Sequence, residues 1–396
     1  MLPDQPLEPT LPLYHSTCSP QIALDYSEST RDGPLCPLSA AENLWRDRAQ
    51  YLESRGYTLR KRYRDNWIPP AGTLRNAALC DYSIGMGNGT VLGNYEYVMD
   101  ATRTSDGTLV FLKAVRRTSR DYEIGLYLSG DHLKHHPYNH CNLILDVLPD
   151  PLDDTNVLLV TPYLRPYNNP ELSSIGEAVD LIKQTLQGLL FMHEAGIAHR
   201  DCTGKNIVMD ASSLYPQGHH PVRINRALDG VQPAVQTRRH ETGVKYYFAN
   251  FGMSTHFQHG DSPLVLGSFG GDHDAPELSD TIPYDAFKLD MFILGSFFYK
   301  ELFDRYHGLK DLEPLAYEMT RHVPSSRPDA LAACNLFDEL LANISESKLR
   351  WRLQPRHEDF WIGIRRNCLA YLREGLYQLK TATRKHYRTS HGTMPE

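Results

Sequence analysis

A carboxylate and an amide stand five residues apart in the segment His199-Arg200-Asp201-Cys202-Thr203-Gly204-Lys205-Asn206. In a loop, an aspartate such as Asp201 can accept the proton of an attacking hydroxyl group. Asn206 can hold a magnesium ion that bridges the phosphates of ATP. Lys205, four residues after Asp201, would neutralise charge on the transferred phosphoryl group. Together, these residue types could support phosphoryl transfer from ATP.

A predicted helix leads into this segment. Residues 177–194 carry apolar side chains at helical spacing, and Gly196 follows as a stop signal. The segment itself is similar to the H-R-D-x-x-x-x-N catalytic loop of protein kinases. That resemblance implies an α+β, two-lobed protein-kinase-like fold, with a small β-rich lobe before a large helical lobe.

A single lysine stands in an apolar segment of the expected small lobe. Residues 108–115 form a β-rich run after the turn Ser105-Asp106-Gly107, and residues 95–101 would complete a hairpin. A buried Lys113 needs a charged partner. We expect Glu123, on the next helix, to pair with it, and the two to position the α- and β-phosphates of ATP. The alternative is a lysine that faces solvent on an edge strand.

The second expected metal ligand departs from the kinase pattern. A predicted strand, Tyr246-Tyr247-Phe248, leads to Asn250-Phe251-Gly252, where protein kinases carry D-F-G. Asn250 offers an oxygen without a negative charge, and hard divalent cations prefer charged oxygen ligands. We therefore expect Asn206 and Asn250 to hold magnesium, or manganese, only weakly.

Three further motifs resemble the large lobe of protein kinases rather than that of small-molecule kinases. Glu277 ends an A-P-E, and Arg327 lies in Ser326-Arg327-Pro328, so the resemblance predicts a buried ion pair between them. Asp290 begins a D-x-x-x-x-G segment and is expected to brace the backbone of the catalytic loop. The acceptor is therefore expected to be a protein hydroxyl, of Ser/Thr or Tyr.

The adenine end of the site is expected after the strand Val157-Leu158-Leu159-Val160. Thr161 falls at the gatekeeper position of a kinase, and Tyr163 falls in the hinge that contacts adenine. The glycines between residues 85 and 93 form no clean G-x-G-x-x-G. They are either a phosphate-binding loop or a linker.

Beyond the kinase motifs, the chain resembles the expanded protein-kinase-like domain found in mushroom-forming basidiomycete fungi. The resemblance runs from about Glu42 to about Leu353. The segments that carry it, besides the motifs above, are Leu44-Trp45-Arg46-Asp47-Arg48, Val98-Met99-Asp100-Ala101-Thr102-Arg103 and Leu214-Tyr215-Pro216-Gln217-Gly218-His219-His220-Pro221-Val222.

The expected organisation has five parts. Residues 1–37 are a flexible arm, 38–79 a helical extension with a helix at 39–55, and 80–160 the small lobe. Residues 161–350 form the large lobe, and 351–396 form a helical tail that is basic over 364–388. Residues 211–241 are a loop-like insertion after the catalytic loop, either a partner site or an idle surface loop.

Composition excludes several classes of protein. The 396 residues contain 41 Lys+Arg against 48 Asp+Glu, a net charge of −7, which does not favour nucleic acid. No apolar run approaches the ~18 residues of a membrane helix. The first residues lack the pattern of a secretory signal. The seven scattered cysteines fit reduced thiols, so we expect an intracellular protein, cytoplasmic or nuclear.

Two smaller features leave alternatives open. The histidines between residues 132 and 140, followed by Cys141, suggest either a zinc site or a plain surface loop. Cys202 is either a redox-sensitive thiol or a small packed hydrophobe.

Two functions therefore stand at this point. The first is an ATP-dependent protein kinase with reduced activity, which acts on an unidentified protein substrate. The second is a pseudokinase that binds nucleotide and acts as a scaffold for a partner protein.

Overall fold

A five-stranded antiparallel sheet forms in the first part of the chain, in a computed structural model that describes residues 38, 40–64, 97–268, 270, 272–368 and 370–371. Its order is β1-β2-β3-β5-β4, and its strands are β1 (Tyr57–Thr58), β2 (Val98–Arg103), β3 (Leu109–Arg116), β4 (Asp146–Pro149) and β5 (Asn156–Pro162). The predicted hairpin is confirmed, because Val98 pairs with Lys113 and Thr102 pairs with Leu109. The glycines between 85 and 93 and the arm 1–37 lie outside the described residues.

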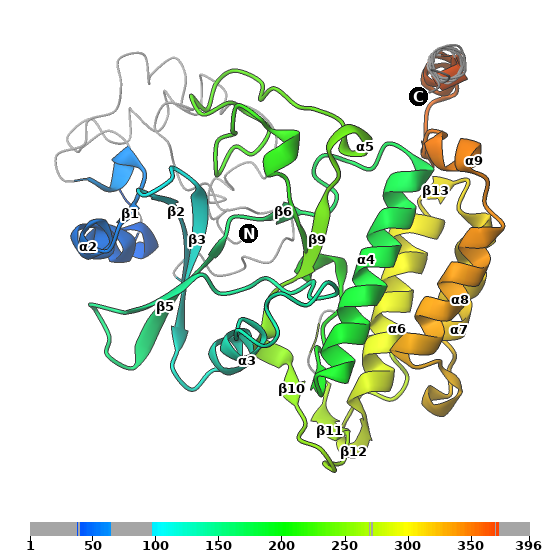
Figure 1. The fold of residues 1–396 in the computed structure, drawn as a ribbon, viewed down its shortest axis with the longest axis horizontal. Helices are drawn as coiled ribbons and strands as arrows, with labels where there is room; N and C mark the ends of the chain where they lie inside the picture. Colours follow the sequence, from blue (N-terminus) through cyan, green and yellow to red (C-terminus); the bar gives the residue numbers. More distant parts are fainter. Residues whose placement is uncertain are drawn as a thin grey trace, which may run out of the picture.

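The two faces of β3 serve different purposes, since alternate side chains of a strand point to opposite faces. Val110, Leu112 and Ala114 are buried in a core that they share with Trp45 and Leu52. These two residues come from α2 (Ala40–Ser54), the helix predicted for the N-terminal extension, which covers that face (Figure 1). Lys113 consequently lies on the opposite face, the side of α3 (Arg120–Leu128).

Buried ion pairs attach the N-terminal extension to the sheet. Arg48 of α2 binds Asp150, which follows β4, through two bonds of 2.6 and 2.9 Å. Within the extension itself, Arg62 binds Glu42 in the same bidentate manner, at 2.8 and 3.1 Å. Because these charges are buried and paired, the extension is an integral part of the sheet region.

Helices dominate the rest of the chain (Figure 1). The predicted helix before the catalytic loop is confirmed as α4 (Ile175–Glu194), and its buried face packs with α6 (Ala286–Phe298) and α8 (Ala330–Ala342) in one large core. A small sheet of β6 (Arg165–Pro166), β8 (Ile207–Asp210) and β9 (Lys245–Phe248) lies beside α4. The chain is therefore α+β, with a curled sheet region followed by a helical region.

Short elements connect these parts. They are β7 (Ile197–Ala198), η4 (Gly204–Asn206), η5 (Ser212–Leu214), α5 (Arg239–Thr242), η6 (Phe251–Met253), β10 (Thr255–His256), β11 (Leu264–Gly267), β12 (Ser279–Asp285), η7 (Tyr299–Phe303), β13 (Tyr306–His307), η8 (Lys310–Leu312), α7 (Glu313–Met319), η9 (Pro324–Ser326), α9 (Glu346–Arg350) and β14 (Gln354–Pro355); η1 (Lys61–Tyr63) follows β1. Residues 360–368 are helical, which includes the start of the predicted tail helix. Among the helices of the described residues, none is both long enough and apolar enough to span a lipid bilayer.

Candidate functional site

The backbone of the predicted catalytic loop is held by one buried carboxylate. Asp290 of α6 accepts hydrogen bonds from the backbone N–H groups of His199 (2.7 Å) and Arg200 (2.6 Å). Its Oδ2 also lies 3.0 Å from Nε2 of His193. Arg200 has a φ of 65°, a left-handed conformation that most side chains avoid and that the two bonds hold in place. The predicted bracing role of Asp290 is confirmed.

His199 fixes the start of the loop as a neutral imidazole. Its Nδ1 accepts from the N–H of Asp201 at 3.2 Å, which leaves Nε2 to donate to the carbonyl oxygen of Ala249, also at 3.2 Å. Complete burial lowers the pKa of His199, which favours this neutral form. The side chain of Asp201 is oriented in turn, since its Oδ1 accepts from the hydroxyl of Thr203 at 3.0 Å.

Lys113 is engaged with two groups, and Glu123 is not one of them. Its Nζ lies 2.7 Å from Oδ2 of Asp121 and 3.1 Å from Oδ1 of Asn250. Glu123 is about half exposed and pairs instead with Arg120 at 3.3 Å. The prediction that Glu123 pairs with Lys113 was therefore wrong, because Asp121 supplies the carboxylate. The alternative of a lysine pointing to solvent is also excluded, because the ammonium group faces the catalytic loop side.

The start of α3 explains the correction. Ser119 caps the helix by accepting from the N–H of Tyr122, so the first turn begins at Arg120. Successive residues of an α-helix are about 100° apart, which places Asp121 and Glu123 about 200° apart around the axis. Only one of them can face Lys113. The 2.7 Å bond from the ammonium group of Lys113 identifies that residue as Asp121.

A chain of hydrogen bonds joins Lys113 to the predicted catalytic loop through the two predicted metal ligands. The side-chain amide of Asn250 accepts from Lys113 and donates, through Nδ2, to Oδ1 of Asn206 at 3.2 Å. Asn206 is buried and donates through its own Nδ2 to the backbone oxygen of Asp201 at 2.8 Å. Four residues from three segments that are far apart in the sequence thus form one connected site.

This arrangement does not fit a magnesium ion as it stands. The oxygens of Asn206 and Asn250 already accept hydrogen bonds, and both are uncharged. Asp121, the carboxylate beside them, is bound to Lys113. Among the described residues, no group of three or more His, Cys, Asp or Glu side chains is placed to hold a metal ion. A hard cation would have to displace existing bonds to reach either amide oxygen.

Thr161 and Lys113 lie on the same face of the sheet. In the register of β3 and β5, Phe111 pairs with Thr161 and Lys113 pairs with Leu159, and cross-strand partners share a face. Thr161 is buried, and its hydroxyl has no hydrogen-bond partner among the described residues. The predicted gatekeeper position therefore adjoins the lysine.

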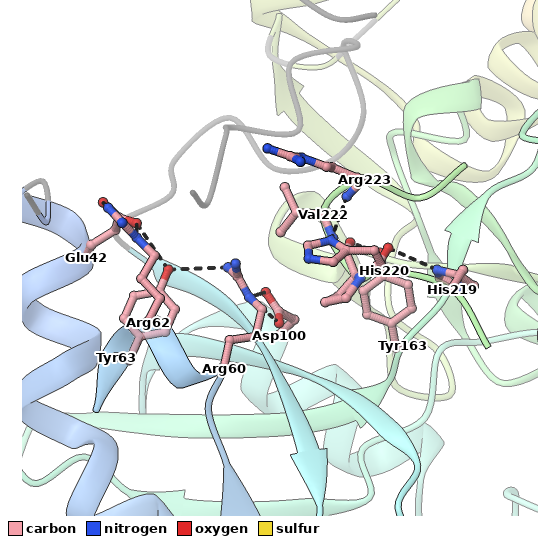
Figure 2. Close-up of polar contacts among 11 residues, drawn as sticks. Glu42, Arg60, Arg62, Tyr63, Asp100, Tyr163, His219, His220, Val222 and Arg223 are labelled. Atoms are coloured by element: carbon pink, nitrogen blue, oxygen red, sulfur yellow. Dashed lines mark hydrogen bonds and ion pairs between the residues drawn. The ribbon is translucent and has the colours of Figure 1, made fainter. Parts of the chain in front are cut away.

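Tyr163 is bound by the insertion rather than left free. Its hydroxyl donates to the backbone oxygen of Pro221, and its ring lies 5.6 Å from that of His219. Figure 2 shows Tyr163 beneath His219, His220 and Val222, with Arg60 and Asp100 of the sheet region opposite them. The insertion consequently reaches the predicted hinge.

A buried arginine anchors the same insertion. Arg165 of β6 donates to the backbone oxygen of Ile224 and to Oδ1 of Asn225 (3.1 Å), and its guanidinium stacks on Tyr215 at 4.3 Å. Desolvation lowers the pKa of Arg165, and the polar acceptors around it offset that cost. These contacts show that the segment packs on Tyr163 and Arg165, and both interpretations of residues 211–241, a partner site or an idle surface loop, stay predictions.

The predicted ion pair of the helical region is confirmed. The guanidinium of Arg327 binds Glu277 through both nitrogens, at 2.5 and 2.9 Å, and both side chains are buried. Arg327 also donates to the backbone oxygens of Arg321 and Lys288. The pair links the segment before β12 to the loop before α8.

The remaining candidates behave as follows. Lys205 is exposed on η4, next to Asn206. Cys202 is fully buried, and burial raises the pKa of its thiol, so it packs as a small hydrophobe. His132, His135 and His136 lie in exposed turns, whereas His140 is buried with Nδ1 2.8 Å from the oxygen of Tyr246.

Sequence reasoning missed two parts of the site. One is Asp121, for which the capping signal of Ser119 was the available clue. The other is the docking of residues 219–225 on Tyr163 and Arg165, for which no local pattern is informative.

Comparison of the chain with models of known protein families gave no match, and comparison with curated proteins gave none. The resemblance to fungal protein-kinase-like domains therefore remains a prediction drawn from the motifs.

Proposed function

We propose that this chain is a two-lobed protein-kinase-like protein that binds ATP beside Lys113 and transfers its terminal phosphoryl group slowly to a protein hydroxyl. The observation that supports this most is the connected chain Lys113–Asn250–Asn206–Asp201. It joins a lysine on a sheet to the backbone oxygen of a potential base, Asp201, in a loop that lies about ninety residues further along the sequence.

The proposed roles follow from these positions. The ammonium group of Lys113, oriented by Asp121, binds the α- and β-phosphates. Asp201 accepts the proton of the acceptor hydroxyl, and Lys205 neutralises charge on the moving phosphoryl group. Thr161 and Tyr163 border the adenine. Glu123 has no part in this scheme, because it points away from Lys113.

Two features favour a protein as the acceptor. The buried Glu277–Arg327 pair resembles the one that closes the activation segment of protein kinases. The bond from Asp290 to the backbone of the catalytic loop belongs to the same set of motifs. We propose no Ser/Thr or Tyr preference, since Lys205 alone does not separate the two.

A second function is favoured by one specific observation. Both predicted metal ligands are neutral amides that are bonded to each other, and a magnesium-dependent enzyme needs anionic ligands there. A pseudokinase that binds nucleotide and serves as a scaffold for a partner protein would keep Lys113 and dispense with fast transfer.

The test is a titration of ATP into the purified protein, followed by a phosphorylation assay with a general protein substrate. We expect ATP binding that Lys113→Met abolishes and that Lys310→Met, a change at an exposed lysine, leaves intact. Slow transfer that Asp201→Asn removes would support the kinase. Binding without any transfer would support the pseudokinase, and absence of binding would exclude both.

A further inference from the structure

The orientation of Asn206 determines which kind of residue can stand at position 250. Asn206 donates through Nδ2 to the backbone oxygen of Asp201 at 2.8 Å, so its Oδ1 is the atom that faces Asn250. An oxygen needs a hydrogen-bond donor opposite it. The residue at 250 must therefore donate toward Asn206.

Lys113 imposes the opposite demand on the same side chain. Its ammonium group is a donor only, and it lies 3.1 Å from Asn250 Oδ1. The residue at 250 must therefore also accept. An amide meets both demands at once, whereas an ionised aspartate can only accept and would place its second oxygen against that of Asn206.

Flipping the side-chain amide of Asn206 would not make an aspartate acceptable at position 250. The flipped amide would turn its oxygen toward the backbone oxygen of Asp201 and lose the 2.8 Å bond that holds the loop. The backbone conformation at position 250 does not select between Asn and Asp either. Asn250 has a φ of 67°, and Asn and Asp both tolerate this left-handed conformation. The selectivity for Asn comes from the side-chain bonds.

The charges around Asn250 lead to the same conclusion. Asp121 already neutralises Lys113, with which it forms a 2.7 Å ion pair. A carboxylate at position 250 would share that single ammonium group with Asp121 and would call for an additional cation. With Asn250 present, the ion pair and the two amides are satisfied by one another.

We propose that Asn250 is a positioning residue that links Lys113 to Asn206 without a divalent cation, so that the phosphate-binding site is assembled in metal-free protein. ATP then binds with an affinity that magnesium does not increase. Asn250 therefore has a specific role in assembling the site without a metal ion, and is not merely a replacement that has lost the function of an aspartate. The location of the phosphates rests on the function proposed above, but the link itself does not.

Thermal unfolding tests the link without nucleotide. In EDTA, Asn250→Asp should lower Tm by about 3 °C or more, because it breaks the bond to Asn206, and millimolar magnesium should recover most of that loss. Wild-type Tm should be the same in EDTA and in magnesium. Asn168→Asp, a charge added at an exposed asparagine, is the matched control and should leave Tm unchanged in both buffers.

Calorimetric titration of wild-type protein with ATP completes the test. The dissociation constants in EDTA and in magnesium should agree within about threefold, which is less than ~0.7 kcal/mol. A gain of tenfold or more with magnesium would overturn the proposal, and so would an Asn250→Asp protein with wild-type Tm in EDTA. If Asn250→Asp does not fold, the wild-type titration decides. If the wild-type protein binds no ATP, the proposed function is wrong. The unfolding data would still test the connection from Lys113 through Asn250 to Asn206.

Discussion

At the scale of single residues, the site is defined by which atoms donate and which accept. Asn250 uses both ends of its amide, and Asp121 holds the ammonium group of Lys113. The two bonds of Asn250 join segments that are distant in the sequence, whereas Asp121 lies eight residues after Lys113. Single substitutions should therefore change nucleotide binding and catalysis in ways that depend on hydrogen-bond chemistry as much as on charge.

Asp121→Asn should weaken ATP binding by about tenfold, or ~1.4 kcal/mol, because Lys113 loses the charge that orients it. Calorimetric titration of ATP measures this change. Glu123→Gln is the matched control on the same helix, and its dissociation constant should stay within about twofold of wild type. Equal effects of the two substitutions would show that the rotation of α3 about its axis in solution differs from its rotation in the structure.

Asn250→Asp should raise magnesium-dependent autophosphorylation by at least about tenfold, a gain of ~1.4 kcal/mol in the barrier, because it adds the missing negative charge. Incorporation of labelled phosphate measures the rate. Asp201→Asn in the same background should abolish it. A variant that binds magnesium-ATP and remains inert would favour the scaffold function.

At the scale of elements, two kinds of attachment hold the site in place. The Glu277–Arg327 pair and the bonds of Asp290 connect the loops of the helical region. The insertion is attached separately, through Tyr163 and Arg165. Both attachments bury charged or titratable groups, so both should respond strongly to substitution or to pH.

Arg327→Ala should reduce the free energy of unfolding by about 3–5 kcal/mol, because it leaves the carboxylate of Glu277 buried and unpaired. Chemical denaturation measures the change. Arg321→Ala, which removes an exposed arginine paired with Glu318, should cost no more than about 1 kcal/mol. A thermally unchanged Arg327→Ala protein would contradict the assigned pair.

His219 should make the docking of the insertion sensitive to acid. Burial, and then the nearby positive charge of Arg165, lower its pKa to about 4. The unfolded chain binds this proton near pH 6.5, before the folded chain does, so stability should fall as the pH drops from about 6.5 to 4. One such group contributes a slope of at most ~1.4 kcal/mol per pH unit.

Chemical denaturation at several pH values measures that slope. His219→Phe keeps an aromatic ring between Tyr163 and Tyr215 and removes the titrating group, so its slope should be shallower. Identical slopes for the two proteins would mean that His219 does not change protonation over this range.

At the scale of the whole molecule, the N-terminal extension and the sheet are one structural unit. Trp45 and Leu52 of α2 share a core with Leu112 and Val160 of the central strands. The other face of the same sheet presents Lys113 and Thr161. Packing on one face therefore supports the candidate site on the other.

Trp45→Ala should cost about 3–5 kcal/mol of stability, because its side chain is fully buried against the sheet. It should also weaken ATP binding, since the sheet that carries Lys113 is loosened. Trp361→Ala, at a tryptophan that is 74% exposed, should change stability by no more than about 0.5 kcal/mol. Equal losses in denaturation experiments would place α2 outside the sheet core.

The sequence by itself determined the local features of this protein. The hairpin around Ser105-Asp106-Gly107 and the helix before the predicted catalytic loop were predictable, because apolar periodicity and turn residues are local signals. The Glu277–Arg327 pair joins residues fifty positions apart and was predicted only from the resemblance to protein kinases. The tertiary structure decided the rest. Asp121 rather than Glu123 meets Lys113 because the start of α3 sets the rotation of the helix. The insertion binds Tyr163 because chain segments about sixty residues apart pack together, and no local pattern encodes such a contact.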